Sequence, residues 1–355
     1  MTVQRIARLR SALRQQRLDA MLVSTLPHIR YLTNFSGSNA ILTLSLRRAV
    51  LYTDSRYAHQ VTREAQGVTC RITSGGLVEA ASRDLRDKVR RVGFESEHLV
   101  HDQYRSLGKH LPGVRLVPLR GVVEAFASVK EKREVAAIKA AVAISEAVLQ
   151  EVAERIRPNV MELDVAAEVS FLHKRKGAEG DAFDPIVASG IRSALPHARP
   201  TRKRIKNGEL VILDIGCRVH GYCSDITRTI VVGRATSQVL RMHAAVSDAV
   251  SAALEGARAM VETAELDKLA RNRIIRAGYG KYFVHSLGHG LGLQVHERPR
   301  LSRTSSERLE SGNVVTIEPG IYLPSLGGVR IEEDILVTST GCRPLGRLSR
   351  DLLIV

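Results

Sequence analysis

The chain has 355 residues, of which 44% are hydrophobic and 25% are charged, and its formal net charge is +16 at pH 7. This composition excludes a largely disordered protein, and the length predicts two domains. No apolar run approaches the roughly 18 residues of a membrane span, and the N-terminal segment lacks the apolar core of a secretory signal. We therefore expect a cytoplasmic protein that does not act at a membrane.

The positive charge makes nucleic acid a candidate partner. However, the basic residues are spread along the chain, Trp is absent and aromatic residues make up only 4% of the sequence. No nucleic-acid-binding motif accompanies the charge. We therefore expect a solvated basic surface and no specific nucleic-acid partner.

Four cysteines, Cys70, Cys217, Cys223 and Cys342, form no C-x-x-C pair, which fits a reducing compartment. Cys217 and Cys223 flank a predicted turn, where a disulfide or an additional metal ligand is the alternative to two reduced packing residues. We favour the reduced residues.

Residues 1–124 have the pattern of an α/β domain. An amphipathic helix opens the chain and turns Ile6, Leu9, Leu13 and Leu18 inward. Periodicity and turn residues then predict strands at 20–24, 40–46, 49–52, 92–95 and 115–118, and helices at 57–65, 77–89 and 101–110.

Residues 125–355 predict an α+β domain of antiparallel strands with helices on one face. Helical spacing of apolar residues and terminating signals give four long helices. They are expected at about 131–156, 162–176, 237–259 and 265–277.

The segment Leu210–Thr229 carries the clearest chemical signal. Its first four residues predict a strand buried on both faces, and Asp214 follows them directly. A tight turn centred between Val219 and His220 would return the chain as a second strand. In that register Asp214 and Asp225 oppose each other about 5 Å apart. Two such carboxylates in apolar surroundings repel unless one is protonated or cations lie between them.

Three histidines, His285, His289 and His296, lie within a short glycine-rich segment. The first two have the spacing of a helical zinc pair, but the Glu of H-E-x-x-H is missing, and Gly288 and Gly290 disfavour a helix. A phosphate loop is a weaker interpretation, because no Lys-Ser/Thr follows. We expect the glycines to let the backbone approach a packed metal site closely.

Two further carboxylates belong to strand-like segments. Glu318 follows the apolar run Val314–Ile317, and Glu332 lies in a predicted strand at Val329–Val337 with Arg330 on the same face. Alone, each carboxylate would be interpreted as a surface residue or an ion-pair partner, for example Glu332 with Arg330.

Taken together, however, these residues form a set of four carboxylates and one imidazole: Asp214, Asp225, His289, Glu318 and Glu332. Such an oxygen-rich set suits two divalent ions of the Mn, Co or Zn kind. Cations would also relieve the repulsion between the aspartates. The sequence therefore predicts two divalent ions per subunit, with Mn²⁺ first and Co²⁺ or Zn²⁺ as alternatives.

In this order and spacing, the five residues resemble the ligand pattern of the pita-bread metallopeptidases, in the branch of Xaa-Pro aminopeptidase and Xaa-Pro dipeptidase (prolidase). Ile29–Ser38 and Tyr52–Tyr57 are similar to the creatinase-like N-terminal domain of that family. The resemblance implies a creatinase-like α/β domain at 1–124, a pita-bread catalytic domain at 125–355, the five residues as metal ligands, and a homodimer.

The resemblance also implies roles for the site residues. Asp225 and Glu332 would bridge both ions, a hydroxide held between the ions would attack the scissile carbonyl, and Glu318 would also shuttle the proton. His197 and His296 match histidines that contact substrate and stabilise the tetrahedral intermediate.

Two more residues are implied to line the site. His285 matches a histidine of the proline-side pocket, and Arg330 matches an arginine beside the ligands. Cys217 and His220 stand where the family often has a small residue and a polar or acidic residue, respectively, but neither belongs to the ligand set.

The implied function is that of an Xaa-Pro aminopeptidase, which hydrolyses the bond between an N-terminal residue and proline in the second position of a peptide. An Xaa-Pro dipeptidase restricted to dipeptides shares every ligand; we favour the aminopeptidase because no clamp for a dipeptide carboxylate is identifiable. A non-catalytic pita-bread binding module and a creatinase-type hydrolase are disfavoured because all five ligands are present. Methionine aminopeptidase is disfavoured by the N-terminal domain.

Overall fold

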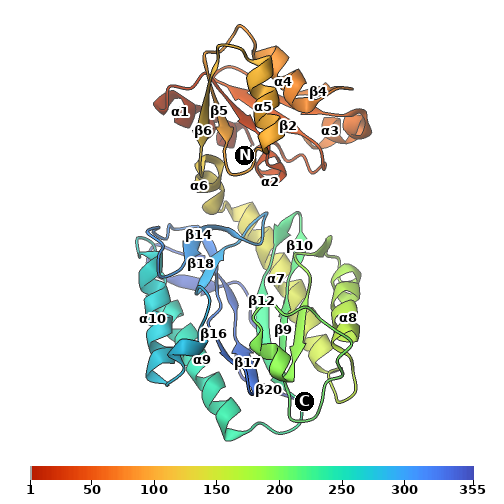
Figure 1. Cartoon of the computed structure of the whole chain (residues 1–355), viewed down its shortest axis with the longest axis vertical. Coiled ribbons are helices and arrows are strands. Elements are labelled where there is room, and N and C mark those ends of the chain that lie inside the picture. Colours follow the sequence, from red (N-terminus) through yellow and green to blue (C-terminus); the bar gives the residue numbers. More distant parts are fainter. Residues whose placement is uncertain (1) are drawn as a thin grey trace. The chain divides into compact units, whose positions relative to one another are not determined.

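The structure of the chain, a computed structural model, describes residues 2–355 and divides them into two compact units (Figure 1). The first unit ends at Ala127 and the second runs from Ser128 to Val355. The domain boundary expected after residue 124 falls inside helix α6 (Val122–Ser128).

The N-terminal unit is built on a six-stranded sheet with the order β4-β3-β2-β1-β5-β6. Its only antiparallel member is β2, which pairs with β1 on one side and β3 on the other; the remaining neighbours are parallel. The strands are β1 (Ala20–Val23), β2 (Ile41–Ser45), β3 (Ala49–Thr53), β4 (Thr69–Ile72), β5 (Arg91–Glu95) and β6 (Arg115–Leu119).

Helices connect and flank this sheet. Besides α6, they are α1 (Thr2–Gln15), α2 (Leu26–Thr33), α3 (Ala58–Glu64), α4 (Leu77–Leu85) and α5 (His101–His110), with a short 3-10 turn at Ser55–Tyr57. The inward face predicted for the first helix is confirmed for Ile6, Leu9 and Leu13, which are each no more than 2% exposed. Leu18 is equally buried but follows the end of the helix at Gln15.

Three elements of this unit were not predicted: β4, α2 and α6. Strand β4 gave no signal because it lies at the sheet edge with mostly exposed side chains. Helix α2 has Pro27 in its first turn. Proline is tolerated there because a backbone N–H in the first turn would have no partner within the helix.

The C-terminal unit contains four sheets, with the orders β11-β10-β7, β20-β12-β9-β8, β14-β13-β15-β18-β19 and β16-β17. The first two contain β7 (Gly180–Asp181), β8 (Ile186–Ser189), β9 (Leu210–Ile215), β10 (Cys217–Val219), β11 (Tyr222–Cys223), β12 (Ile226–Val231) and β20 (Leu353–Ile354). The others contain β13 (Gly288–Gly290), β14 (Glu297–Leu301), β15 (Val314–Ile317), β16 (Gly320–Leu323), β17 (Gly327–Arg330), β18 (Glu333–Val337) and β19 (Cys342–Pro344).

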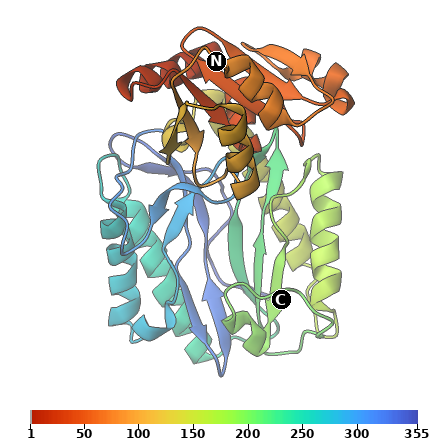
Figure 2. The same ribbon diagram turned by 45° about the horizontal axis from the view of Figure 1, so that its top comes forward.

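Two pairs of helices enclose these strands (Figures 1 and 2). The pairs are α7 (Lys132–Ala153) with α8 (Glu162–Arg175), and α9 (Ser237–Gly256) with α10 (Thr263–Arg276); 3-10 turns lie at Gly190–Ala194 and Gly280–Tyr282. One buried apolar cluster joins α7 and α8 to β8, β9 and β12, and a second joins α9 and α10 to β15–β18. All four helices lie within a few residues of their predicted bounds, and no helix of residues 2–355 is long and apolar enough to cross a membrane.

The hairpin that carries both aspartates is present, but its predicted register is wrong. His220 and Gly221 both have positive φ, 52° and 80°, so they form the two-residue turn that suits the twist of a hairpin. Val219 therefore pairs with Tyr222, and Asp214 pairs with Thr227 instead of Asp225. Since the shift is two residues, both aspartates still point to one face of the sheet.

The single strand predicted at Val329–Val337 is also wrong. The strand is interrupted at Ile331–Glu332, so that β17 belongs to the two-stranded sheet and β18 to the five-stranded sheet. At this break in the strand, the backbone N–H of Glu332 donates to the carbonyl of Thr227 on β12 at 3.1 Å.

Candidate metal centre

The five predicted ligands come from both halves of the C-terminal unit. Asp214 is near the end of β9 and Asp225 immediately precedes β12, whereas His289 lies on β13, and Glu318 directly follows β15. Glu332 occupies the break between β17 and β18. The site therefore lies where the sheets of the two halves meet, and its assembly depends on the whole unit.

His289 is placed among the carboxylates. Its Nε2 lies 3.4 Å from Oε1 of Glu318 and 3.7 Å from Oδ2 of Asp225, while its Nδ1 lies 3.1 Å from the carbonyl oxygen of Gly290. The carbonyl can only accept, so Nδ1 carries the proton and Nε2 of the neutral ring presents a lone pair to the carboxylates. Asp225, His289 and Glu332 each offer a ligand atom within 4.8 Å of the other two.

Burial disfavours the charged forms of Asp225, Glu318, Glu332 and His289. Desolvation, with repulsion from neighbouring carboxylates, raises the pKa of Asp225 and Glu318 well above their usual values and that of Glu332 to about 8. Burial also lowers the pKa of His289 to about 4, and the neighbouring His296 adds to the effect. The protein thus places acceptor groups together, and a cation is what would satisfy them.

The two carboxylate oxygens of Asp214 have different surroundings. Its Oδ2 accepts a hydrogen bond from Nη2 of Arg330 at 2.5 Å, whereas its Oδ1 is buried without a hydrogen-bond partner among residues 2–355. A buried carboxylate oxygen rarely remains unsatisfied. The example ion pair of Arg330 with Glu332 does not form; the cation pairs with Asp214.

The residues therefore fit a divalent metal site. Two independent observations support the fit: the lone pair of His289 faces carboxylate oxygens, and an oxygen of Asp214 lacks a donor. The donor set of carboxylates with a single imidazole suits Mn²⁺, Co²⁺ or Zn²⁺ and excludes a thiolate-bound structural zinc.

Glycines allow the strand of His289 to approach its neighbours. A Cβ atom on Gly288 would lie 2.1 Å from the carbonyl oxygen of Thr316, and one on Gly290 would lie 2.1 Å from that of Arg298. Any side chain at these positions would push β13 away from β15 and β14. The glycines are therefore required for close backbone packing around the site, as the sequence suggested.

Sequence reasoning missed two groups that hold the ligands in place. Thr227 donates its hydroxyl to Oε2 of Glu332 at 2.6 Å, and buried Asp334 accepts the backbone N–H of Asp225 at 3.0 Å. The signal for Thr227 was its pairing with Asp214, which only the correct hairpin register reveals. Asp334 lay in the predicted strand Val329–Val337, but the sequence analysis gave it no role of its own.

His285 belongs to a chain of hydrogen bonds that ends at the ligands. Its Nδ1 donates to the carbonyl of Ser286 and its Nε2 accepts from the hydroxyl of Tyr322, both at 2.8 Å. Tyr322 in turn accepts from Nη1 of Arg330 at 2.8 Å. Burial lowers the pKa of His285 to about 4, with Arg330 adding to the effect, so this histidine is neutral.

His197 and His296 lie at the edge of the site. The ring of His296 stands edge-on to that of His289 with centroids 4.4 Å apart, and both His197 and His296 are exposed. His197 directly follows Pro196, whose carbonyl accepts from Nη1 of Arg330 at 3.1 Å, so the backbone at His197 lies next to the site. These are imidazoles that a ligand at the site could reach.

Arg300 is a further residue that the sequence analysis did not single out. It is exposed, and its positive charge contributes to lowering the pKa of His289 and His296. Its Nη2 lies 3.4 Å from the hydroxyl of Ser286. Arg300 pairs with His289 across β13 and β14, and an exposed cation there is suited to receiving an anionic group of a ligand.

The cysteines take no part in the site. All four are free thiols, and Cys217 donates to the carbonyl of Ala141 at 3.3 Å. Burial raises the pKa of Cys217, and it raises the pKa of Cys223 to about 12, so both are neutral packing residues. No disulfide joins them in the structure.

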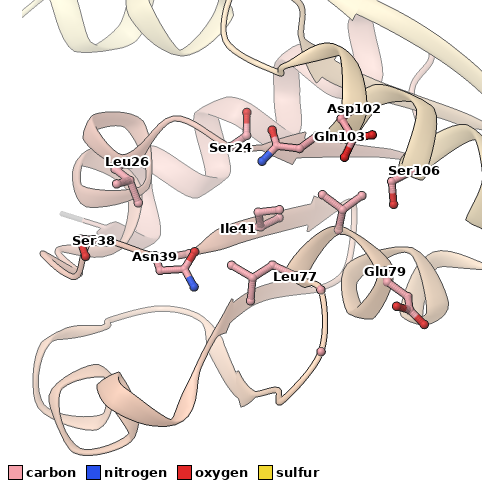
Figure 3. Close-up of a pocket in the computed structure, with 14 residues that line it drawn as sticks. Ser24, Leu26, Ser38, Asn39, Ile41, Leu77, Glu79, Asp102, Gln103 and Ser106 are labelled. Atoms are coloured by element: carbon pink, nitrogen blue, oxygen red, sulfur yellow. The ribbon is translucent and has the colours of Figure 1, made fainter.

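A separate pocket of about 510 Å³ lies in the N-terminal unit (Figure 3). It is lined largely by polar groups at the end of β1, the start of β2 and the first turns of α4 and α5, including Ser24, Asn39, Glu79, Asp102 and Gln103. None of the predicted site residues lines it.

Comparison with known proteins identifies the family of this chain. Residues 136–339 match metallopeptidase family M24, and residues 5–129 match the creatinase/prolidase N-terminal domain. An Xaa-Pro dipeptidase from Pyrococcus horikoshii is 36% identical over 337 residues, which cover 95% of each chain. A solved structure described as an Xaa-Pro dipeptidase from Bacillus anthracis has a TM-score of 0.97 at 37% identity over the full length of both chains.

A further solved structure, of an X-Pro aminopeptidase from Thermotoga maritima, has a TM-score of 0.89 at 35% identity and covers 96% of this chain and all of its own. The match to the family extends over more than half of the chain. The chain belongs to metallopeptidase family M24. It is an α+β metallopeptidase with a creatinase-type N-terminal domain and a pita-bread catalytic domain, as the sequence predicted.

Proposed function

We propose that this chain hydrolyses the bond between an N-terminal residue and a following proline, using two divalent metal ions. The observation that carries the proposal is the placement of the lone pair on His289 Nε2 opposite the buried carboxylate of Asp225 and the partly buried carboxylate of Glu318. Its relatives named for Xaa-Pro cleavage cover nearly the whole chain.

The proposed ligands are Asp214, Asp225, His289, Glu318 and Glu332, with Asp225 and Glu332 shared by both ions. When bound, the ions would lower the pKa of water and polarise the scissile carbonyl. We propose Mn²⁺ as the first candidate, because four of the five donors are carboxylates, with Co²⁺ or Zn²⁺ as alternatives.

The protein groups around the ligands have separate proposed roles. Glu318, whose pKa is raised by burial, is suited to holding and passing on the proton that the leaving amine requires. His197 and His296 would donate to the carbonyl oxygen as negative charge develops on it. His285 would line the proline-side pocket, where Tyr322 and Arg330 hold its ring in one orientation.

We propose Xaa-Pro aminopeptidase activity first and Xaa-Pro dipeptidase activity second. The aminopeptidase expectation depended on the lack of an identifiable clamp for the carboxylate of a dipeptide. Arg300 supports the second candidate, because an exposed guanidinium close to His289 and His296 could bind that carboxylate.

A panel of three peptides tests both candidates. The metal-loaded enzyme is given Ala-Pro, Ala-Pro-Ala and Ala-Ala-Ala, and release of alanine is measured. Preference for Ala-Pro-Ala supports the aminopeptidase, and cleavage confined to Ala-Pro supports the dipeptidase. Equal cleavage of Ala-Ala-Ala would contradict the proposed proline specificity.

The assembly and location of the chain are also proposals. We propose a homodimer, which sedimentation at micromolar concentration would test; a monomer alone would contradict it. A cytoplasmic location is supported by the four free cysteines, which fit a reducing compartment.

A further inference from the structure

The N-terminal unit brings two histidines and a glutamate together beyond the carboxyl ends of three strands. Strands β1, β5 and β6 are parallel neighbours, so their carboxyl ends lie side by side. His28 lies in α2 after β1, His98 follows β5, and Glu124 lies in α6 after β6. In open parallel sheets, ligands bind outside the carboxyl ends of the strands, where the connecting segments begin.

These three side chains are close enough to share an ion after a small adjustment. Each offers one ligand atom within 4.8 Å of the other two, and Nε2 of His98 lies 3.3 Å from Oε1 of Glu124. The rings of His28 and His98 are nearly perpendicular, with centroids 5.4 Å apart. A tetrahedral site with bonds of about 2.1 Å needs its ligand atoms about 3.4 Å apart. The side chains of His98 and Glu124 are 33% and 19% exposed, so they have room to close that gap.

A buried carboxylate fixes the ring of His28. Glu95, the last residue of β5, is 4% exposed, and its Oε1 lies 2.5 Å from Nδ1 of His28. Its Oε2 accepts from the backbone N–H groups of Ser24 and Thr25 at 2.7 and 2.9 Å and from both hydroxyls at 3.3 and 2.9 Å. Five hydrogen bonds thus hold one carboxylate in place.

This network also determines which nitrogen of His28 can bind a metal. Burial raises the pKa of Glu95, but the hydrogen bond and charge of His28 outweigh it, and the net pKa lies below the usual value. An ionised carboxylate only accepts, so Nδ1 of His28 keeps its proton, and a metal that displaces the second proton of the ring would bind at Nε2. A carboxylate that orients the second nitrogen of a histidine is the common support of a histidine metal ligand.

We propose that His28, His98 and Glu124 form a zinc site in the N-terminal unit, separate from the five-residue site of the C-terminal unit. Two imidazoles and one carboxylate are a donor set that zinc favours, with the fourth position left to water. Mg²⁺ and Ca²⁺ would prefer oxygen ligands alone. The alternative is two metal-free ion pairs, His28 with Glu95 and His98 with Glu124.

Counting and locating zinc in the untagged full-length protein tests the proposal. The chain is stripped with chelator, titrated with Zn²⁺ and followed by calorimetry, alongside His98→Ala and the matched control His101→Ala, which removes an exposed histidine of α5. Ions bound at the other site are common to all three proteins. We expect the wild type and the control to bind one zinc more than His98→Ala, or to bind it at least 10-fold more tightly.

Two further measurements complete the test. Anomalous scattering at the zinc edge from crystals of the zinc-loaded protein should show a peak between His28, His98 and Glu124. The visible spectrum of four-coordinate Co²⁺ should lose one component in Glu124→Gln, a second variant with an accessible position. Equal zinc content and affinity in the wild type and His98→Ala, with no anomalous peak in the N-terminal unit, would overturn the proposal in favour of ion pairs alone.

Discussion

The guanidinium of Arg330 lies 2.5 Å from Oδ2 of Asp214, inside a site where the two side chains are only 3% and 11% exposed. The same guanidinium donates to Thr227, Tyr322 and the carbonyl of Pro196. Arg330 is thus a fixed positive charge beside a cluster of carboxylates. It partly neutralises the cluster and leaves the remaining negative charge to be balanced by metal ions.

Replacing Arg330 by Met tests this role. The substitution leaves Asp214 buried without its cation, so we expect the metal-free protein to lose about 3 kcal/mol of unfolding free energy. Urea denaturation of the metal-free wild type and variant measures the difference. A loss below about 0.5 kcal/mol, the range of ordinary surface substitutions, would show that the ion pair does not stabilise this site.

Asp225→Ala should abolish both metal binding and activity while leaving the fold intact. Asp225 is one of the three residues whose ligand atoms lie within 4.8 Å of one another, and it is proposed to hold both ions. Metal content, peptide hydrolysis and circular dichroism are compared with the control Glu255→Ala, which removes an exposed carboxylate of α9. Normal turnover by Asp225→Ala would refute the two-metal proposal.

Asp334→Asn should weaken metal binding without removing a ligand. Asp334 accepts the backbone N–H of Asp225, and an asparagine can keep that bond only with its carbonyl oxygen correctly oriented. Changes to such supporting groups cost roughly 10- to 100-fold in metal affinity. We expect activity to recover at high Mn²⁺ with KM for the peptide unchanged. If excess Mn²⁺ fails to restore activity, Asp334 acts in some way other than positioning Asp225.

Glu332→Gln should change the stability of the metal-free protein in a pH-dependent manner. Burial, with repulsion from Asp214, raises the pKa of Glu332 from 4.5 to about 8. Between these values the folded protein keeps a proton that the unfolded chain releases, so the wild type loses stability as pH rises from about 4.5 to 8. Glutamine cannot lose that proton.

We therefore expect metal-free Glu332→Gln to match the wild type at pH 5 and to exceed it by about 3 to 4 kcal/mol at pH 8, since each pH unit between the unfolded and folded pKa values is worth about 1.4 kcal/mol. Added Mn²⁺ should reverse the order at pH 8, because the wild type alone keeps the full ligand set. Chemical denaturation of both metal-free proteins at both pH values, and of both proteins with Mn²⁺ at pH 8, gives the unfolding free energies to compare. Parallel pH curves for the two metal-free proteins would contradict the assigned burial of this charge.

His296→Gln should reduce kcat by about 10²- to 10³-fold, the usual cost of removing a donor to developing negative charge. Mn²⁺ affinity should change little, because His296 is not a proposed ligand. The control is His220→Asn, a change in the exposed hairpin turn that tolerates the positive φ of 52° at that position. A drop in Mn²⁺ affinity that accounts for the whole loss of activity would remove His296 from the catalytic role.

Much of the fold followed from periodicity, and the exceptions have physical causes. Helix α7 and the buried strand β9 carry long apolar patterns that tertiary structure has no reason to override. Strand β4 is short and exposed at a sheet edge, so it lacks such a pattern. The hairpin register failed by two residues because the turn type depends on positive φ at His220 and Gly221, which hydrophobicity does not report.

The residues of the candidate site could be proposed from the sequence, but the groups that support them could not. Four carboxylates and a histidine in strand-like surroundings are conspicuous, because burying them without a cation is costly. Thr227, Asp334 and Arg300 are chemically ordinary in the sequence. The first two gain their contacts only because β12 and the residue before it lie beside β18 and the residue before it. The partner of Arg330 was likewise a matter of tertiary structure, because Asp214 lies 116 positions away.

The measurement that tests the central claim most directly is Mn²⁺ titration of the metal-stripped enzyme, with bound metal and hydrolysis of Ala-Pro and Ala-Pro-Ala followed on the same samples. We predict no cleavage without metal, and activity that rises with binding until two ions per chain are bound. Absence of cleavage of both peptides with Mn²⁺, Co²⁺ and Zn²⁺ would contradict the account and favour a binding protein on the same fold.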